Sequence, residues 1–218
     1  MEKIIVTTLD GETITLAGED TLEIIENEDN LDWNSFLGAC ENEDGDDDKI
    51  IVERILEVAD KFNIDLNVKD KNDANCFLIA CGGGNIEIVE LILEVAEKYN
   101  IDLNATNDKG MNAFMYACAI GHKDIVEKIF EVAEEFNFDL NAKNGGGYTG
   151  FMIACAAGNK DIVEKFLEVA EEFSFDLNAK NEDGYTGFAL ADTEGREDIV
   201  EMITEVAEDL SIDLEKPE

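Results

Sequence analysis

The sequence predicts an all-α protein, a solenoid of repeated helix-turn-helix units with a short β-hairpin cap at its N-terminus. Three observations predict it: a sequence repeat of 37 residues, apolar side chains at helical spacing within each repeat, and a hairpin signal near the start. The chain has 218 residues, which is long for one compact core, but a repeat array has no central core that limits its length. Hydrophobic residues make up 45% of the chain, so we expect a folded protein.

The repeat is visible in several residue types that return at the same step. Phenylalanine, asparagine and valine each recur every 37 residues, at Phe77, Phe114, Phe151 and Phe188, at Asn67, Asn104, Asn141 and Asn178, and at Val52, Val89, Val126, Val163 and Val200. Phe36 lies 41 residues before Phe77, so the first repeat carries four extra residues, which we place in the acidic run 41–48. We therefore expect an N-terminal hairpin and capping helix over 1–28, and then, over 29–218, five repeats: 29–69, 70–106, 107–143, 144–180 and 181–218.

Each repeat has the periodicity of two helices. In the repeat 107–143 a short helix presents Phe114, Ala117 and Cys118, and a break at Gly121-His122 follows. A second helix then presents an apolar stripe at i, i+3 and i+4 spacing, made of Ile125, Val126, Ile129, Phe130, Ala133 and Phe136. No single repeat can bury these faces alone, so we expect neighbouring repeats to stack into a continuous core.

Residues suited to capping stand at the expected helix ends. Asparagine or threonine precedes the first helix of every repeat, at Asn34, Asn75, Asn112, Thr149 and Thr186. Asparagine also stands where the second helix should end, at Asn63, Asn100 and Asn137, because it tolerates the left-handed conformation. Ser174 and Ser211 hold the same place, and we expect them to stop the helix less well.

The N-terminal segment predicts a hairpin followed by a short helix. Asp10-Gly11 is a two-residue turn signal, the run Thr13 to Leu16 alternates, and Asp20 to Glu23 looks like a capping box. The segment also resembles the opening of ubiquitin over about 25 residues, at Ile4-Ile5-Val6, Thr8-Leu9, Gly11, Thr13-Ile14-Thr15-Leu16 and Asp20-Thr21. The rest of that fold and its di-glycine tail are absent from the sequence, so we interpret the segment as a cap that closes the solenoid.

The five repeats resemble the ankyrin repeat. The motifs that carry the resemblance are Gly184-Tyr185-Thr186-Gly187-Phe188 with Ala191, Gly121-His122 with Ile125-Val126, and Asp139-Leu140-Asn141-Ala142. The resemblance covers roughly residues 29–218. It implies a non-catalytic scaffold that binds a protein partner through its turn tips and concave groove.

The chain departs from the ankyrin pattern at the start of the first helix. The family's proline is replaced by Ser35, Cys76, Ala113, Gly150 and Gly187, and its histidine by Leu78, Met115, Met152 and Ala189. The second helix is longer by about one turn than in the usual unit of about 33 residues. Because proline favours the first helical position, we expect a first helix that starts less firmly and a second helix that is taller.

The net charge of the chain limits the classes of molecule that it can bind. There are 53 acidic and 16 basic residues, a net charge of −37, which repels nucleic acids and anionic membranes and attracts basic proteins. We expect a protein partner, and a basic protein would be compatible with this charge. We expect no direct binding to nucleic acid or membranes, and we expect the chain to be a monomer. The N-terminus lacks a signal-peptide pattern and the sequence lacks an apolar run of about 18 residues, so the expected location is intracellular and cytoplasmic.

Neither the cysteines nor the histidine predicts a chemical site. Cys40, Cys81, Cys118 and Cys155 share one register, and stacked helices hold such positions too far apart for disulfides, so we interpret them as small buried apolar residues. Cys76 lies outside that register without a zinc spacing, and His122 has no paired nucleophile. We therefore expect no catalytic residues, no metal and no cofactor.

Two further motifs favour loops over ligand sites. The glycine runs 82–84 and 145–147 lack the phosphate-loop pattern, so we interpret them as turns. The acidic run 41–48 fails the calcium-loop pattern because Cys40 and Ile51 would fall on ligand positions.

One register of the repeat carries large side chains on the turn that precedes the first helix. It contains Trp33, Met111, Tyr148 and Tyr185, with Ala74 between the first two. Side chains of these types often dominate protein interfaces, so the register is a candidate partner-binding site. The alternative is that they pack on neighbouring turns, and tryptophan and tyrosine often do both.

The second helices carry ladders of acidic residues. Two ladders stand four residues apart in every repeat: Glu53, Glu90, Glu127, Glu164 and Glu201, and Glu57, Glu94, Glu131, Glu168 and Glu205. A third contains Asp60, Glu97, Glu134, Glu171 and Glu208. Like charges at this spacing destabilise a helix by about 0.2–0.5 kcal/mol per pair. The ladders have two possible interpretations. One is an adaptation for solubility or high salt that repeat duplication copied. The other is an acidic decoy that mimics nucleic acid and occupies a basic, nucleic-acid-binding protein.

Overall fold

The computed structural model describes residues 4–7, 13–16, 35–41, 46–62, 64–209 and 214. The chain divides into two compact units, a first unit of residues 1–108 and a second unit of residues 109–218, and each is described by itself. Several sequence predictions fall outside the described residues: the turn at Asp10-Gly11, the short helix from Asp20, and Trp33. Asn34, Asn63 and Ser211 fall outside them too.

The first unit begins with the predicted hairpin. Strand β1 (Ile4–Thr7) pairs antiparallel with β2 (Thr13–Leu16), so that Ile4 faces Leu16 and Val6 faces Ile14 across the ladder. β1 lies against helix α1 (Ser35–Cys40), the first helix of the first repeat.

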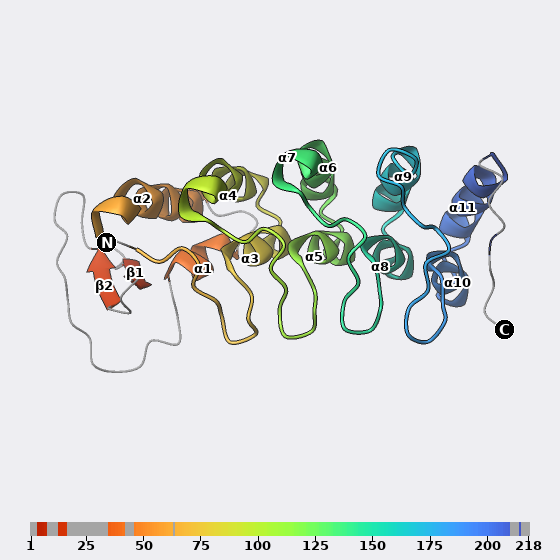
Figure 1. The fold of residues 1–218 in the computed structure, drawn as a ribbon, viewed down its shortest axis with the longest axis horizontal. Helices are drawn as coiled ribbons and strands as arrows, with labels where there is room; N and C mark the ends of the chain where they lie inside the picture. The colour runs from red at the N-terminus through yellow and green to blue at the C-terminus, as the bar shows by residue number, and fades with distance from the viewer. Residues whose placement is uncertain are drawn as a thin grey trace. The chain divides into compact units, whose positions relative to one another are not determined.

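The rest of the first unit is made of two helix pairs. Short helices α1 and α3 (Cys76–Gly83) pack against each other in one layer, and longer helices α2 (Asp46–Phe62) and α4 (Ile86–Tyr99) pack in a second layer (Figure 1). The core between the layers contains Phe36, Phe77, Ile55, Ile88 and Ile92, all fully buried. α1 and α3 approach so closely that a Cβ added to Gly83 would lie 2.2 Å from the carbonyl oxygen of Glu41.

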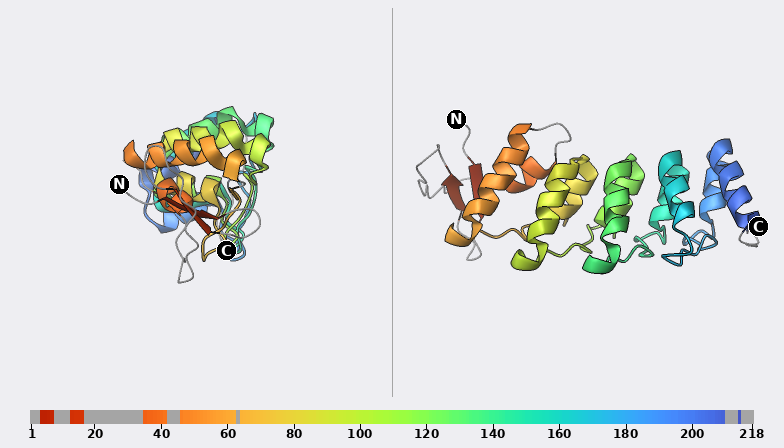
Figure 2. Two further views of the ribbon diagram at one scale, coloured as in Figure 1. Left: turned by 90° about the vertical axis from the view of Figure 1, so that its left-hand side faces the viewer. Right: turned by 90° about the horizontal axis from the view of Figure 1, so that it is seen from above.

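The second unit repeats the same arrangement. Its short helices are α5 (Ala113–Ile120), α8 (Gly150–Ala157) and α10 (Gly187–Thr193). Its second layer contains α6 (Lys123–Glu131), the short α7 (Ala133–Phe136), α9 (Lys160–Glu168) and α11 (Glu197–Asp209). Seen from above, α6, α9 and α11 lie side by side over the short helices (Figure 2, right). The predicted all-α class with two helices per repeat is confirmed.

The predicted helix caps are confirmed wherever the structure describes them. The side-chain oxygen of Asn75 accepts the backbone N–H of Leu78 at 3.0 Å, and Asn112 does the same for Met115 at 2.9 Å. Thr149 and Thr186 cap α8 and α10 with their hydroxyl oxygens. Each cap accepts an N–H that has no partner within the first turn of a helix that begins without the family's proline.

The chain adopts the predicted left-handed conformation after the second helices at asparagine, and it does so at a serine too. Asn100 and Asn137 adopt the left-handed conformation, with φ of 51° and 52°. Ser174 adopts it as well, with φ of 52°, so serine turns the chain at this place just as asparagine does.

The prediction of one continuous second helix is wrong for the third and fourth repeats. α6 ends at Glu131 and α9 at Glu168, because Val132 (φ −107°, ψ 8°) and Val169 (φ −106°, ψ 11°) leave the helical conformation. Phenylalanine rings from the segment that follows α9 pack on both helices: the Phe173 ring stacks on Phe130 of α6 with centroids 5.6 Å apart. In the fourth repeat Phe175 packs on Phe166 at 4.9 Å. In the second repeat, where the smaller Ile101 stands in the place of Phe175, α4 runs unbroken to Tyr99.

Asparagine side chains join neighbouring repeats within each unit. The Asn67 amide donates to the carbonyl oxygen of Tyr99 at 3.1 Å, and Asn141 donates to that of Phe173 at 3.4 Å. Asn159 donates to the carbonyls of Cys118 at 2.7 Å and Ala119 at 3.2 Å, at the end of α5. These asparagine amides therefore satisfy carbonyl groups near or beyond the ends of helices, where the helical hydrogen bonds stop.

Candidate protein-binding face

The short helices of the second unit carry almost no charge. α5 and α8 have no charged residue, and α10 has only Asp192. Their inner sides bury Phe114, Phe151 and Phe188. The opposite side presents apolar residues to solvent, since Tyr116 and Ile153 are half-buried and 59% of Ile120 is exposed.

The turns before α8 and α10, residues 143–149 and 180–186, form fingers held by one asparagine each. The side-chain oxygen of Asn144 accepts the backbone N–H of Gly146 at 2.9 Å and of Tyr148 at 3.0 Å. Asn181 likewise accepts from Asp183 at 3.1 Å and from Tyr185 at 2.8 Å. These hydrogen bonds hold the backbone of each tyrosine in place.

Backbone hydrogen bonds link successive fingers. Gly145 N–H donates to the Lys109 carbonyl at 3.0 Å, and Glu182 N–H donates to the Gly146 carbonyl at 3.0 Å. The predicted turn at 145–147 is therefore part of a stacked row. We call the outward side of α5, α8 and α10, together with Met111 and the fingers 143–149 and 180–186, the groove face.

The structure places the large side chains of the candidate register that it describes against neighbouring turns, with part of each side chain exposed. Met111, Tyr148 and Tyr185 are half-buried in neighbouring positions of successive repeats. Met111 packs on the next finger, where its sulfur accepts the Asn144 amide at 3.2 Å, and the Tyr148 ring lies beside Gly146. Ala74, in the same register of the first unit, is buried.

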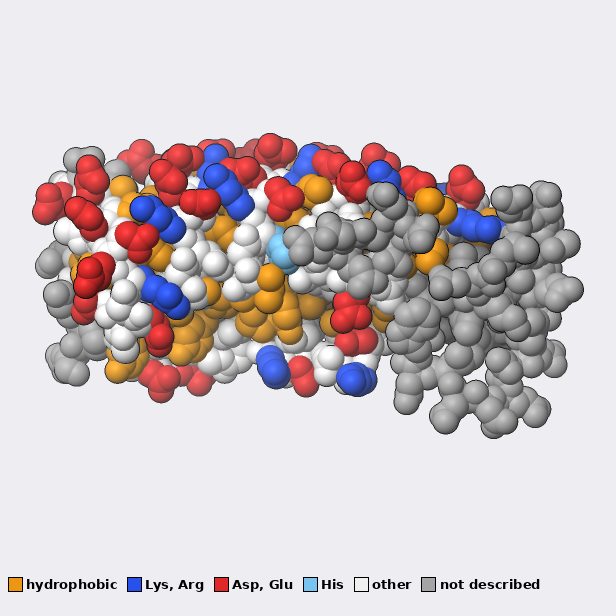
Figure 3. Space-filling view, turned by 180° about the vertical axis from the view of Figure 1, so that it is seen from behind, with side chains coloured by type: hydrophobic (Ala, Val, Ile, Leu, Met, Phe, Trp, Pro, Cys, Tyr) orange, Lys and Arg blue, Asp and Glu red, His pale blue; other side chains and the backbone are white. Residues whose placement is uncertain are grey.

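Sequence reasoning did not select the residues on the short helices. Ile79, Tyr116, Ile153 and Leu190 recur every 37 residues and are all half-buried. The available signal was an apolar residue two places after each repeated phenylalanine. In Figure 3, hydrophobic side chains gather over the second unit between an acidic upper edge and charged tips below.

The acidic ladders lie on the outward side of the second helices. All ten residues of the two main ladders are exposed except Glu127, which is half-buried. Some carboxylates pair with lysines, as in Lys98–Asp60 at 2.6 Å, Lys165–Glu168 at 3.1 Å and Lys160–Asp198 at 3.6 Å. The hydrogen bond from Lys98 lowers the pKa of Asp60, and the bond to Glu168 raises the pKa of Lys165.

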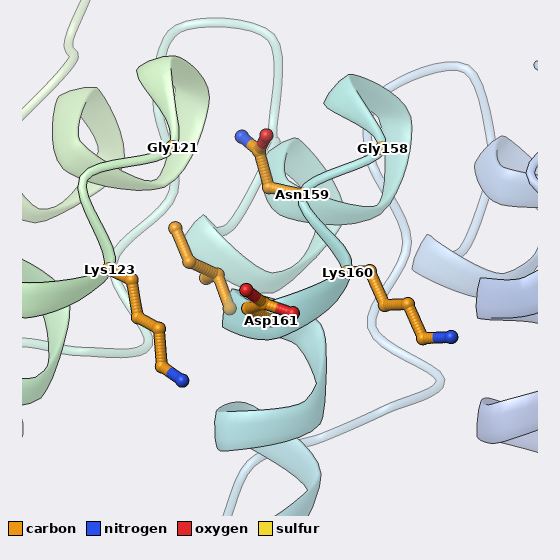
Figure 4. Close-up of a pocket in the computed structure, with 7 residues that line it drawn as sticks. Gly121, Lys123, Gly158, Asn159, Lys160 and Asp161 are labelled. Atoms are coloured by element: carbon orange, nitrogen blue, oxygen red, sulfur yellow. The ribbon is translucent and has the colours of Figure 1, made fainter.

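A shallow pocket of about 260 Å³ lies between the turns that open α6 and α9 (Figure 4). The side chains of Lys123 and Lys160 extend in similar directions and do not approach each other (Figure 4), and the Asn159 amide donates to the carbonyls at the end of α5. The lining groups therefore do not converge on one point where a ligand would sit.

The buried thiols of the described residues are not activated as nucleophiles. All five cysteines are buried and outside disulfides, and this was predicted for the four that share one register, Cys40, Cys81, Cys118 and Cys155. Burial raises the pKa of the Cys76 thiol to about 12, and it raises those of Cys81, Cys118 and Cys155 as well. A reactive cysteine needs the opposite shift. His122 stands before α6 and does not cap its backbone with the side chain.

Metal-binding clusters and membrane-spanning helices are both absent from the part of the chain that the structure describes. Across those residues, no group of three or more histidine, cysteine, aspartate or glutamate side chains could hold a metal ion. Within the same ranges, no helix is long and apolar enough to cross a membrane.

Comparison with known proteins identifies the family. A family model for ankyrin repeats in three copies matches residues 37–138, and one for ankyrin repeats in many copies matches residues 132–191. No curated protein matches the chain. The stacked helix pairs, the fingers and these two matches together show that the chain belongs to the ankyrin repeat family, whose members are generally non-catalytic modules for protein–protein interaction.

Proposed function

We propose that the chain is a non-catalytic scaffold that binds a protein partner on the groove face, around Met111, Tyr148 and Tyr185, with Trp33 in the same register. The observation that carries the proposal is the difference between the two layers. The short helices α5 and α8 are uncharged and present apolar side chains, whereas the second helices carry the exposed acidic ladders.

The geometry supports recognition at the fingers. Tyr148 and Tyr185 are half-buried, so part of each ring is open to a partner while the backbone is held by Asn144 and Asn181. Fixed aromatic side chains lose little conformational freedom on binding, which favours them as anchors. Because the short helices of this face carry almost no charge, binding against them should depend only weakly on salt.

The test is to capture partners from a lysate with the whole chain and to wash them at low and at high salt. The affinity for a captured protein is then compared between a double variant and a control variant. The double variant Tyr148→Ala/Tyr185→Ala should weaken binding of a captured protein about tenfold or more, since truncated hot-spot residues cost on the order of 2 kcal/mol. Tyr99→Ala, which removes a tyrosine from the end of α4, is the matched control and should leave that binding unchanged. Equal affinity of the double variant and the control would reject the groove face as the binding site.

A second candidate function is an acidic decoy, favoured by the exposure of the ladders and the net charge of −37. It predicts that the captured proteins are basic, bind nucleic acid and dissociate at high salt. Glu90→Gln/Glu94→Gln should then weaken capture, whereas Tyr148→Ala/Tyr185→Ala should not.

We also propose that the chain is monomeric and works inside the cell without contacting nucleic acid or membranes. A net charge of −37 opposes the approach of a second copy and of any polyanion. Sedimentation at about 0.15 M salt should give the mass of one chain. A dimer under those conditions would contradict this part of the proposal.

A further inference from the structure

The finger 143–149 contains the pair Asn144-Gly145, and Asn144 is the one asparagine of the chain that glycine follows. The backbone nitrogen of the next residue can attack the side-chain amide of an asparagine. Glycine favours this attack because it has no side chain beside the nitrogen and leaves the backbone free to bring the two groups together. Asn144 is half-buried and Gly145 is exposed, so solvent reaches the pair. The sequence therefore makes Asn144 the asparagine most prone to lose its amide.

The loss of the amide, or deamidation, consumes only water. Hydroxide removes the N–H proton of Gly145, and the nitrogen forms a bond to the side-chain carbonyl carbon of Asn144. The bond from that carbon to the amide nitrogen then breaks, and the amide takes a proton from water and leaves as ammonia, which restores the hydroxide. Water finally opens the cyclic succinimide to give aspartate or, through the other carbonyl, isoaspartate, whose main chain is one carbon longer.

The row of fingers opposes this reaction in the folded chain. The Gly145 N–H donates to the Lys109 carbonyl oxygen at 3.0 Å, so hydroxide cannot remove the proton until that bond opens. Gly110 permits this close approach, because its φ is 72° and a Cβ at this position would lie 2.8 Å from the Gly145 nitrogen. The rate of deamidation should therefore follow the opening of the junction between these two fingers.

The fold already contains an aspartate at an equivalent position. Asp70 stands two repeats of 37 residues before Asn144. One carboxylate oxygen of Asp70 accepts the backbone N–H groups two and four residues ahead, each at 2.8 Å. The side-chain oxygen of Asn144 accepts the N–H groups at the same two positions, at 2.9 Å and 3.0 Å. An aspartate at 144 would keep both bonds and lose only the amide bond to the sulfur of Met111, which is a weak acceptor.

We propose that Asn144 is a deamidation site that the contact between fingers protects in the folded chain, and that the finger accepts the aspartate product. Asn181 has the same pair of hydrogen bonds in the next finger, but Glu182 follows it, so it should keep its amide. Conversion of Asn144 replaces a neutral amide by a carboxylate and so adds a charge to one finger of the groove face.

The first experiment measures where and how fast amides are lost. The full chain is incubated at mildly alkaline pH in native buffer and in urea, and each asparagine is followed by mass spectrometry of proteolytic peptides. Asn144 should convert first in both conditions, and about tenfold or more faster in urea, because the fingers are then apart. Equal rates at Asn144 in buffer and in urea, or faster conversion at another asparagine such as Asn181, would overturn the proposal.

The second experiment opens the junction between the two fingers. Gly110→Ala forces a methyl group against the Gly145 nitrogen. Gly184→Ala is the matched control, because its φ of 83° imposes a similar backbone strain and no described atom lies within 4 Å of its added Cβ. At a temperature where thermal melts show both variants folded, Gly110→Ala should lose the Asn144 amide about threefold or more faster than Gly184→Ala. Equal rates would show that the contact between fingers gives no protection.

The third experiment tests the product with two variants that make the same change of charge. Asn144→Asp should shift the melting temperature by less than about 2 °C, because the side chain still accepts both hydrogen bonds. Asn159→Asp should lower it by about 4 °C or more, because the Asn159 amide is a donor to the carbonyls of Cys118 and Ala119. A fall for Asn144→Asp as large as that for Asn159→Asp would show that the finger rejects aspartate.

Discussion

Replacing Gly150 by alanine tests how tightly the short helices of the second unit pack. Gly150 is the first residue of α8, where helix propensity alone favours alanine over glycine by about 0.5–1 kcal/mol. A Cβ at this position would lie 2.8 Å from Cε1 and 3.1 Å from Cδ1 of Phe114. It would also lie 3.4 Å from the sulfur of Cys118. Helix propensity therefore predicts that Gly150→Ala raises the free energy of unfolding, whereas packing predicts that it lowers it.

The packing term should be the larger one because the Phe114 ring has little room to move. It is 3% exposed and meets Phe130 at 5.4 Å and Phe166 at 5.5 Å between ring centroids. Overpacking of a well-filled core costs about 1–3 kcal/mol. We therefore expect Gly150→Ala to lower the free energy of unfolding by about 1–2 kcal/mol, the difference between the two terms. Gly187→Ala should behave alike, since its Cβ would lie 2.7 Å from Cε1 of Phe151.

The assay is urea denaturation followed by circular dichroism at fixed salt, on single and double variants. In a Phe114→Leu background the ring that opposes the new methyl group is gone, so Gly150→Ala should become neutral or stabilising there. A double-mutant cycle gives the coupling between the two positions directly. If Gly150→Ala stabilises the protein while Phe114 is present, the ring yields easily and the reasoning is refuted.

Three further predictions concern charge, capping and the thiols. Raising the salt from low to moderate concentration should raise the melting temperature, because it screens repulsion between the ladders; a flat or falling melting temperature would show that the ladders repel less than their spacing implies. Asn112→Ala should lower the free energy of unfolding by about 1 kcal/mol in urea denaturation, because it removes the cap on the Met115 N–H; an unchanged value would show that water replaces the cap. Burial holds the pKa of Cys76 at about 12, against 9.0 for a free thiol, so the folded chain keeps a proton that the unfolded chain loses. This contribution to stability should be fully present below pH 9 and disappear as the pH rises toward 12, and thiol labelling of the native protein at pH 8 should be slow. Rapid labelling of a folded sample would contradict it.

The repeat and its helix ends could be predicted from the sequence because each depends on local chemistry. Asn112 caps α5 because its side chain reaches the N–H of Met115 three residues away, which needs no knowledge of the rest of the fold. The burial of the cysteine register followed in the same way from helical spacing.

Features that depend on contacts between repeats could not be predicted. The apolar spacing of residues 125–136 favours one helix, yet Val132 interrupts it in a repeat where Phe130 meets Phe173 from the next repeat. The arrangement of Lys98 has the same origin, since nothing in the spacing shows that its ammonium reaches Asp60 on the preceding repeat. The exposure of Ile120 was missed because an apolar residue at the end of a short helix is more often buried.

The side-chain hydrogen bonds between repeats have a mechanical consequence for the second unit. Asn159, Asn141 and Lys143 all join the third repeat to the fourth, and Arg196 joins the fourth to the fifth by donating to the Ala156 carbonyl at 3.5 Å. Because each bond spans only one junction, a stretching force is borne by the junctions in series and breaks the weakest first. Pulled from its ends, this unit should lengthen in separate steps of one repeat, and on release it should recover by the same steps in reverse.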